Sequence, residues 1–298
     1  MSKISFSQYQ MWKQCPHRWK LLYVDKIKVH EPSIILCFGT AMHTVIQAYL
    51  TTYYNSTIKS ADAIDLCEQL KLELIKEYKL SVVKNEGKPF STPEEMKEYF
   101  TDGCNILNWI RKNKTKYFPK TGYELVGMEY PIDYLPSEKN KNVNLIGYLD
   151  IVVRNIETGK ICIYDLKTSV NGWNKYAKAD KTKISQLVLY KSFYADQYNI
   201  PPDDIDIQYV ILKRKVDEDA EFPAMRKYIQ LFVPASGRVS RNYIRSEIDM
   251  FVEKCFNDDG TKREDAVHLP IAGEKDKNCR FCVFKERYDL CPKENRTK

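Results

Sequence analysis

Two neighbouring segments of the chain read Val143-Asn-Leu-Ile-Gly147-Tyr-Leu-Asp150-Ile-Val-Val-Arg154 and Ile161-Cys-Ile-Tyr-Asp165-Leu-Lys167-Thr168. Both are rich in Val, Ile and Tyr, which are the residues favoured in β-strands. The five residues 155–159 between them have the composition of a short turn, so the strands 143–154 and 160–168 are expected to pair as a hairpin. Such a hairpin brings Asp150 close to Asp165.

Side chains alternate between the two faces of a strand, so Asp165 and Lys167 share one face. The other face carries Cys162, Tyr164 and Leu166. Burying a carboxylate and an ammonium group in an apolar strand is costly, which indicates a site. Two carboxylates from adjacent strands are hard ligands for Mg²⁺ or Mn²⁺, and Lys167 could orient or deprotonate a water molecule or stabilise charge on a phosphate. From these residues alone, a simple strand-end ion pair is an equally good interpretation.

Outward from this hairpin, the spacing of apolar residues predicts a chain in three parts. Region 1–118 is expected to be helical, with a helix capped by Ser5, one over 38–53, and others starting near Ser60 and Pro93. Region 119–235 is expected to be the core, with further strands at 123–134, 203–213 and 227–234 and a helix over 182–198. Region 236–298 is expected to contain a helix over 239–256 and a cysteine-rich tail. This order predicts an α/β protein.

Length and composition limit the class of protein. The chain has 298 residues, of which 43% are hydrophobic and 29% charged, as in a globular protein with a sizeable core. Its net charge of +7 permits a polyanionic partner without requiring one. No apolar run approaches the ~18 residues of a membrane helix, and no secretory signal is visible at the N-terminus. A cytoplasmic location is therefore expected, in a compartment where the nine cysteines stay reduced.

Three further motifs accompany the hairpin. His43 lies in Gly39-Thr-Ala-Met-His43 on an expected helix, and Gln186 and Tyr190 lie four residues apart on another, so they share a face. The set closely resembles the RecB-like branch of the PD-(D/E)XK nuclease superfamily. This resemblance covers most of the chain, from Ser5 to Cys291, and it implies a restriction-endonuclease-like core, which is a mixed sheet flanked by helices.

The resemblance also implies roles for these residues. The cation, Mg²⁺ or Mn²⁺, would be bound by His43, Asp150, Asp165 and the backbone carbonyl of Leu166. Lys167 would be the catalytic lysine, while Gln186 and Tyr190 would hold DNA or the active-site strand. Glu129 stands where the family often has an acid near the site. Taken alone, His43 would more readily be interpreted as a structural helical histidine, and Tyr190 as a core residue.

The tail contains a second group of candidate ligands. Cys279-Arg-Phe-Cys282 is followed by Cys291, and Cys15 is the obvious fourth cysteine. Four thiolates suit tetrahedral zinc or an iron–sulfur cluster. Resemblance to AddB-type and CRISPR-adaptation nucleases favours a [4Fe–4S] cluster that would staple the chain ends, although the gap before Cys291 is longer than usual in those proteins. The other cysteines are expected in the core, namely Cys37, Cys67, Cys104, Cys162 and Cys255.

Two basic stretches contain aromatic residues, 111–120 and 174–183. Lysines neutralise phosphates and aromatic rings stack on bases, a combination used by proteins that bind single strands. For the first stretch a solvated helix end is the favoured interpretation, whereas the second follows Lys167 closely, which favours DNA contact. No P-loop motif is present, so the chain carries no helicase motor of that type.

Together these features predict a metal-dependent DNA nuclease, with an exonuclease on single-stranded or end-frayed DNA implied by the resemblance. The expected setting is recombination, repair or replication, and the Lys-, Asn-, Tyr- and Ile-rich composition is compatible with a microbial or phage genome. One alternative is a CRISPR-adaptation nuclease that trims prespacers. Another is a non-catalytic DNA-binding scaffold of a helicase–nuclease complex. A third is a zinc-stapled nucleic-acid-binding protein. Expected partners are DNA and a helicase, recombinase or adaptation protein, and the oligomeric state is open.

Overall fold

The computed structural model describes residues 1–135 and 140–297 and divides the chain into two units. Unit 1 comprises Met1–Glu31, Pro131–Gly147 and Gly237–Lys298, and unit 2 comprises Pro32–Tyr130 and Tyr148–Ser236. The chain passes between the units within two strands, β2 (Tyr123–Tyr134) and β3 (Val143–Asn155). The three parts expected from the sequence are consecutive stretches of the chain. Each of the two units in the structure instead combines segments that lie far apart in the chain.

The sheet of unit 2 has β4 (Ile161–Ser169) between β3 and β5 (Ile205–Lys213). β3 and β4 are antiparallel, with Ile151 opposite Tyr164, so the hairpin predicted from the sequence is present. β5 is parallel to β4 and β6 (Ile229–Phe232) is antiparallel to β5, while β2 pairs with β3. The mixed α/β sheet expected from the sequence is therefore confirmed.

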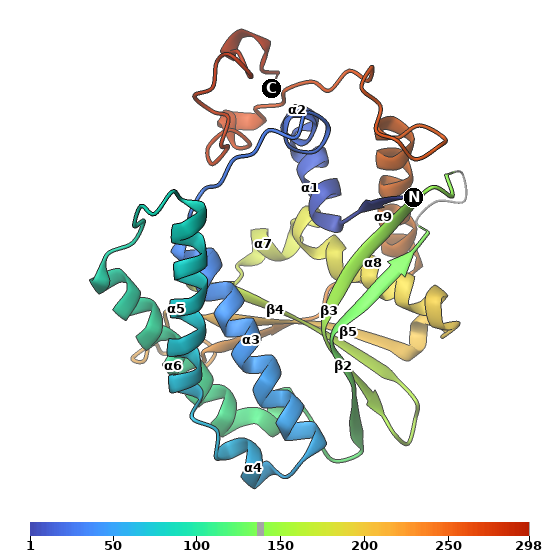
Figure 1. Cartoon of the computed structure of the whole chain (residues 1–298). Helices are drawn as coiled ribbons and strands as arrows, with labels where there is room; N and C mark the ends of the chain where they lie inside the picture. Colours follow the sequence, from blue (N-terminus) through green and yellow to red (C-terminus); the bar gives the residue numbers. More distant parts are fainter. Residues whose placement is uncertain (136–139, 298) are drawn as a thin grey trace. The chain divides into compact units, whose positions relative to one another are not determined.

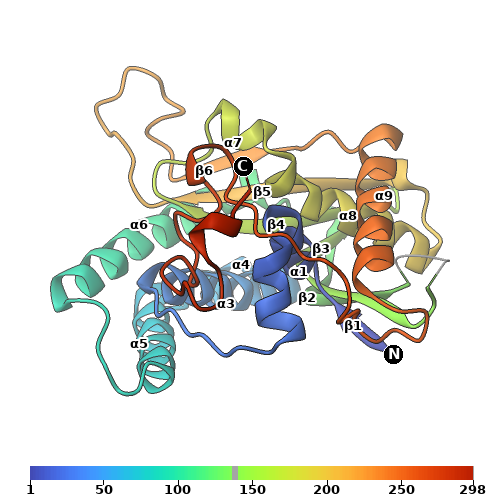
Figure 2. The same ribbon diagram turned by 90° about the horizontal axis from the view of Figure 1, so that it is seen from above.

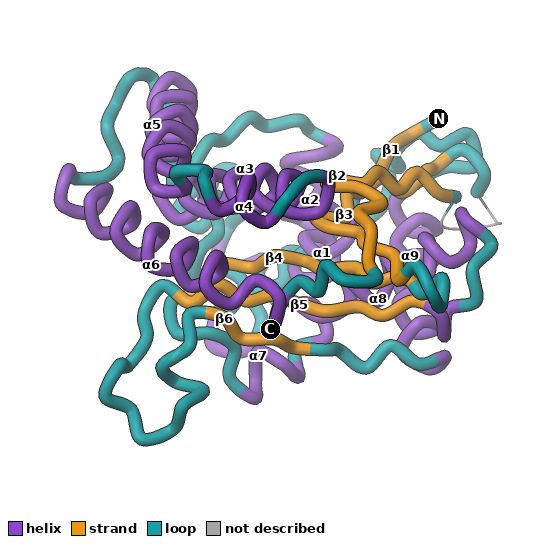
Figure 3. The backbone as a smooth tube through the Cα atoms, turned by 90° about the horizontal axis from the view of Figure 1, so that it is seen from below, coloured by secondary structure: helices purple, strands orange, loops and turns teal. Residues whose placement is uncertain are grey.

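Helices cover both faces of this sheet. On one face lie α3 (Ile34–Asn55), α5 (Leu66–Lys84) and α6 (Pro93–Tyr117), as Figure 1 shows. Their apolar residues form one core with those of β3, β4 and β5. The short α7 (Lys175–Ala179) and then α8 (Lys181–Tyr198) form the crossover between β4 and β5. α8 lies on the other face of the sheet, as seen from above and below in Figures 2 and 3. A parallel pair needs such a crossover, which is why α8 separates the two strands in sequence.

Within the described part of the chain, α3 is the one helix long and apolar enough to cross a membrane by length and composition. Half of the most apolar 18-residue stretch of α3 is buried in the fold. Its buried residues, among them Phe38, Ile46 and Leu50, belong to the core of unit 2. The apolar character of α3 is thus accounted for by packing against the sheet.

The helix expected from Ser60 onward is wrong in its continuity. The structure has a short α4 (Ile58–Asp62) and then α5, which starts at Leu66. The Asp65 side chain accepts hydrogen bonds from the backbone N–H groups of Cys67 and Glu68 and so begins a new helix. The start of α6 is as predicted, because Pro93 is its first residue, and the structure adds Thr92 as its N-cap.

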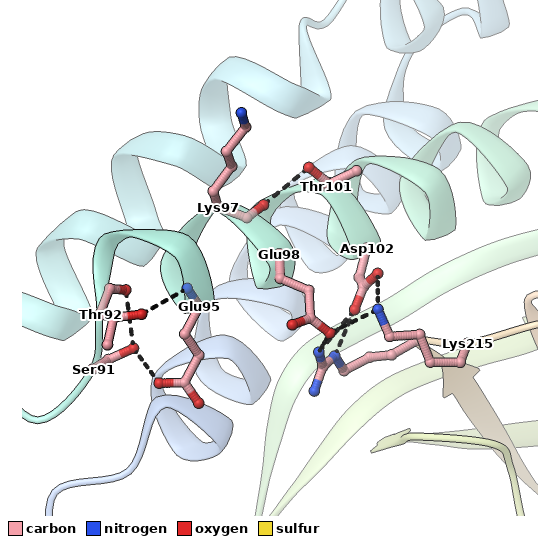
Figure 4. A network of polar contacts seen from close by, with 9 residues as sticks. Ser91, Thr92, Glu95, Lys97, Glu98, Thr101, Asp102 and Lys215 are labelled. Atoms are coloured by element: carbon pink, nitrogen blue, oxygen red, sulfur yellow. Dashed lines mark hydrogen bonds and ion pairs between the residues drawn. The ribbon is translucent and has the colours of Figure 1, made fainter.

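Ion pairs attach α6 to the end of β5 (Figure 4). The buried carboxylate of Asp102 lies 2.8 Å from Arg214 and 3.0 Å from Lys215, and Glu98 also pairs with both. Arg214 in turn donates its backbone N–H to Ser169, the last residue of β4. A buried carboxylate with two cationic partners is stable where an unpaired one would not be. The network therefore fixes α6 to the sheet edge where β4 and β5 end.

Unit 1 begins with a strand, β1 (Ser2–Ile4), which pairs in parallel with the first residues of β3. The expectation of helices alone in the first region is wrong here, because three residues are too few to show strand periodicity. Ser5 caps α1 as predicted. The other elements are α1 (Phe6–Gln14), α2 (Pro16–Trp19), η1 (Lys20–Val24), α9 (Arg238–Cys255), η3 (Glu274–Asp276) and η4 (Lys293–Asn295), with η2 (Pro202–Asp204) in unit 2. α1 and α9 contact each other through Trp12 and Phe251.

Candidate active site and cysteine cavity

The two aspartates lie where the β3–β4 ladder ends. The last backbone pair on this side is Ile151 with Tyr164, so Asp150 and Asp165 are the next residues on the two strands. Beyond this pair a side chain takes the place of a backbone carbonyl as acceptor, because Asp150 Oδ2 accepts the N–H of Leu166 at 2.6 Å. Burial raises the pKa of Asp150 well above its usual value, and the neighbouring Asp165 raises it further. Two buried carboxylates side by side repel each other when both are ionised, so a cation between or beside them favours the doubly ionised form.

Lys167 supplies one such cation. Its Nζ lies 2.7 Å from Asp165 Oδ1 and donates to Gln186 Oε1 at 3.1 Å. Burial lowers the pKa of Lys167, but Asp165 and Asp150 more than offset this, and the net shift is upward. Lys167 is therefore an ammonium ion at neutral pH, which suits stabilisation of negative charge better than abstraction of a proton.

The helix α8 holds the far side of this lysine. Gln186 donates from Nε2 to the hydroxyl of Tyr190 at 3.3 Å, so the pair expected to share a face does so. The first turns of α8 are fixed by Tyr209 on β5, whose hydroxyl lies 3.0 Å from the Lys183 carbonyl and accepts the Leu187 N–H at 3.3 Å. Tyr209 is a positioning residue that the sequence pattern did not indicate.

His43 approaches the aspartates from α3. Its Nδ1 lies 3.6 Å from Asp150 Oδ2, and its ring is hydrogen-bonded to the Leu166 carbonyl. Burial lowers the pKa of His43, and the positive charge of Lys167 lowers it further. A neutral imidazole is the form that binds a metal ion. His43 and the Leu166 carbonyl thus lie together on the side of Asp150, where the resemblance places them.

Glu129 and Gln47 complete this side of the site. Gln47 is 9% exposed, and its Nε2 donates to Glu129 Oε1 at 2.6 Å and to the Asp150 carbonyl at 3.3 Å. Glu129 has a φ of 43°, which is rare for a residue other than glycine and adds local strain. Sequence reasoning missed Gln47, although it stands four residues after His43 on the same helical face.

Among the described residues, His43, Glu129 and Asp150 form a group whose ligand atoms lie within 4.8 Å of one another. One imidazole and two carboxylates are a suitable donor set for Mn²⁺ or Mg²⁺. The carboxylate of Asp165, expected as a second acidic ligand, is not one of the three and pairs with Lys167. The structure therefore brings every residue of the expected set together. Hydrogen bonds join His43, Leu166 and Asp150 in one group, and the contacts of Lys167 join Asp165, Gln186 and Tyr190 in the neighbouring one.

The four cysteines of the expected staple line one small cavity in unit 1. Cys15 lies between α1 and α2, whereas Cys279, Cys282 and Cys291 come from the irregular C-terminal segment. All nine cysteines of the chain are free thiols. Of those expected in the core, Cys37 and Cys255 are buried and the other three are partly buried.

The surroundings of these thiols suit a metal centre. Cys15 Sγ accepts the N–H of Ile271 at 3.4 Å, and the backbone of Phe284 hydrogen-bonds Cys282. Such N–H donors stabilise thiolates. His268, an imidazole in the same C-terminal region, lies against Trp19 and does not line this cavity. Four convergent sulfur ligands fit either a [4Fe–4S] cluster or tetrahedral zinc.

The two basic stretches differ. In 111–120, Lys114 pairs with Asp62 at 2.8 Å, and Lys120 donates to the carbonyls of Tyr54 and Ser56. These two lysines serve the fold through such contacts and so differ from the solvated helix end that was the favoured interpretation of that stretch. In 174–183, Tyr176 is 73% exposed with Lys175 above its ring.

Comparison with protein families matches residues 3–289 to the PD-(D/E)XK nuclease superfamily. A comparison with curated proteins finds no match. Because the family match spans nearly the whole chain, the chain belongs to this superfamily, and its sheet with helices on both faces is the fold expected of a member.

Proposed function

We propose that this PD-(D/E)XK superfamily member is a metal-dependent deoxyribonuclease of the RecB-like branch, acting as an exonuclease on single-stranded or end-frayed DNA. One observation carries the proposal. Asp150, Asp165 and Lys167 converge at the ladder end, with His43 and Glu129 beside them. A protein that used this fold only as a scaffold would gain nothing from burying two carboxylates together, which is costly.

The residues that would hold Mg²⁺ or Mn²⁺ are His43, Glu129 and Asp150, with Asp165 and the Leu166 carbonyl next to them. A bound cation would supply Lewis acidity to the scissile phosphate. Gln47 orients Glu129, and the Leu166 N–H orients Asp150. These contacts fix two carboxylate ligands before any cation binds, which lowers the cost of assembling the site.

Lys167 acts on the substrate as a positive charge. Asp165 and Gln186 hold its ammonium group from two sides, so it is placed before a phosphate arrives. A preorganised cation stabilises the additional negative charge of a phosphodiester under attack without costly reorganisation. Tyr190 fixes Gln186 and acts through it as a positioning residue.

The stretch 174–183 supplies a surface for the DNA strand. Tyr176 is exposed and could stack on a base, while the lysines around it could neutralise phosphates. For the cysteine cavity we propose a [4Fe–4S] cluster, with zinc as the alternative. A role in recombination, repair or replication, or the trimming of prespacers, depends on partners such as a helicase, a recombinase or an adaptation protein.

The experiment is cleavage of end-labelled single- and double-stranded DNA by wild type and Lys167→Ala, with Mn²⁺, Mg²⁺ or EDTA. The matched control is Lys160→Ala, which removes an exposed lysine from the β3–β4 turn. We expect metal-dependent digestion by wild type and control, and none by Lys167→Ala. Progressive loss of label from one end indicates an exonuclease and gives its polarity. If folded, metal-loaded wild type leaves every substrate intact, the scaffold function replaces the nuclease.

A further inference from the structure

The wall of the cysteine cavity is cationic. Besides the four cysteines it is lined by Arg18, Arg296, Lys285 and His17, and no carboxylate is among its described lining residues. His17 Nε2 is engaged by the Leu290 carbonyl at 2.8 Å. A charged wall of one sign around a small cavity favours an occupant of the opposite sign.

Both arginines have a buried N–H group without a hydrogen-bond partner in the described part of the chain. Arg296 donates from one Nη to the carbonyls of Lys285 and Cys291, each at 2.7 Å. Among the described residues, the Nε atoms of Arg18 and Arg296 are buried without a hydrogen-bond partner. A buried guanidinium N–H without a partner is costly, so an acceptor is expected there.

Both arginines line the same cavity as the four thiols. Guanidinium groups at this position favour the thiolate form of cysteine, which is the form that binds metal.

We propose that Arg18 and Arg296 compensate the charge of a four-cysteine metal centre and thereby set its reduction potential and its retention of metal. The inference rests on the metal centre proposed above and not on nuclease activity. Four cysteinates around a doubly positive core leave two net negative charges, which two guanidinium groups neutralise. In a partly buried site this compensation matters, because screening by water is weak. The unpartnered Nε–H groups would donate to sulfur.

The test compares Arg18→Gln and Arg296→Gln with Arg280→Gln, an exposed arginine between Cys279 and Cys282 that does not line the cavity. Protein purified without oxygen is assayed for iron, sulfide and visible absorption, and its midpoint potential is measured by a mediated redox titration. Removal of a nearby positive charge disfavours the more negative reduced state. We therefore expect a lower potential in both variants, a larger shift in the double variant, and no shift in Arg280→Gln.

Arg296→Lys separates charge from packing, because it retains the charge and loses the planar guanidinium group. We expect it to restore most of the wild-type potential. If the protein is colourless and contains zinc, the readout is the rate of zinc transfer to a chromophoric chelator. We then expect transfer about tenfold faster in Arg18→Gln and Arg296→Gln than in the control, in line with the effect of residues that support metal ligands. Unchanged potentials or transfer rates, or no bound metal, overturn the proposal. Loss of DNA cleavage alone bears only on the nuclease.

Discussion

The candidate active site in unit 2 and the cysteine cavity in unit 1 are built in opposite ways. In the first, carboxylates and an imidazole stand on regular elements, β3, β4 and α3, and hydrogen bonds hold them in position. In the second, the thiols stand between helices and in an irregular segment, beside a small apolar cluster of Leu21, Phe284 and Cys291. The sheet and α3 can therefore position the ligands of the first site without a bound metal, whereas the tail has little core of its own.

Because the two sites are built differently, substitutions in them should affect different properties, the catalytic chemistry in one case and the stability of the fold in the other. Substitutions in the carboxylate site should abolish chemistry and leave folding almost unchanged. Substitutions in the cysteine cavity should act first on folding, because a structural metal contributes directly to the free energy of unfolding.

The largest effect is expected from Asp165→Ala, which removes the carboxylate that holds Lys167. The rate of DNA cleavage should fall by about 10³-fold or more, because preorganised charge at the reacting phosphate is lost. Single-turnover cleavage measures the rate, and circular dichroism should show an intact fold. A variant that cleaves within tenfold of wild type would remove Asp165 from the site.

The next effect is expected from Cys282→Ala, which removes one of the four thiols. The brown colour that an iron–sulfur cluster would give the protein should be lost, and the melting temperature should fall by about 10 °C, as expected when several kcal/mol of metal-derived stability disappear. The control is Cys67→Ser, a partly buried cysteine of α5 outside the cavity. Equal melting temperatures for Cys282→Ala and wild type would show that the cavity has no structural role.

A smaller effect is expected from Gln47→Ala, which leaves Glu129 without its hydrogen bond. Affinity for Mn²⁺ should fall by about 10-fold, the lower end of what ligand-orienting residues contribute. Calorimetric titration measures it, with the exposed Thr44→Ala on α3 as control. The two variants should melt at nearly the same temperature, and equal affinities would argue that Glu129 does not bind the cation.

The smallest effect is expected from Asp150→Asn without added divalent cation. The pKa of Asp150 is raised in the folded protein, by burial and by Asp165, so its ionised form destabilises the fold. The variant should melt about 3 °C above wild type at pH 8, as expected for roughly 1 kcal/mol in a chain of this size. Because the penalty is present above the folded pKa and vanishes below the unfolded one, the difference should shrink as the pH falls. A melting temperature below that of wild type at pH 8 would contradict this.

The sequence predicts much of the carboxylate site for a local reason. Strand periodicity places Asp165 and Lys167 on one face, and helical periodicity places Gln186 with Tyr190. Both depend only on neighbouring residues and are confirmed by the contacts. The pairing of Gln47 with Glu129 was not predicted, because 82 residues separate them and only packing of α3 on the sheet brings them together.

The break between α4 and α5 was missed because apolar residues recur at helical spacing on both sides of it. The break is marked instead by the Asp65 side chain, which accepts a hydrogen bond from a backbone N–H group and leaves no trace in the apolar pattern. In the tail, cysteine spacing and resemblance predicted which thiols meet. Neither indicated that Arg18 and Arg296 line the same cavity, since arginines in a basic chain carry no distinguishing pattern.

The sequence by itself determined the order of strands and helices apart from β1 and the break between α4 and α5, the faces of β4 and α8, and the kind of ligand at each site. These follow from the repeat of the backbone and the chemistry of single side chains. Only the tertiary structure decided which cation each buried carboxylate meets, how Glu129 is oriented and what charge surrounds the cysteines. Such contacts join residues far apart in the chain, and burial of the core, not local propensity, brings them together.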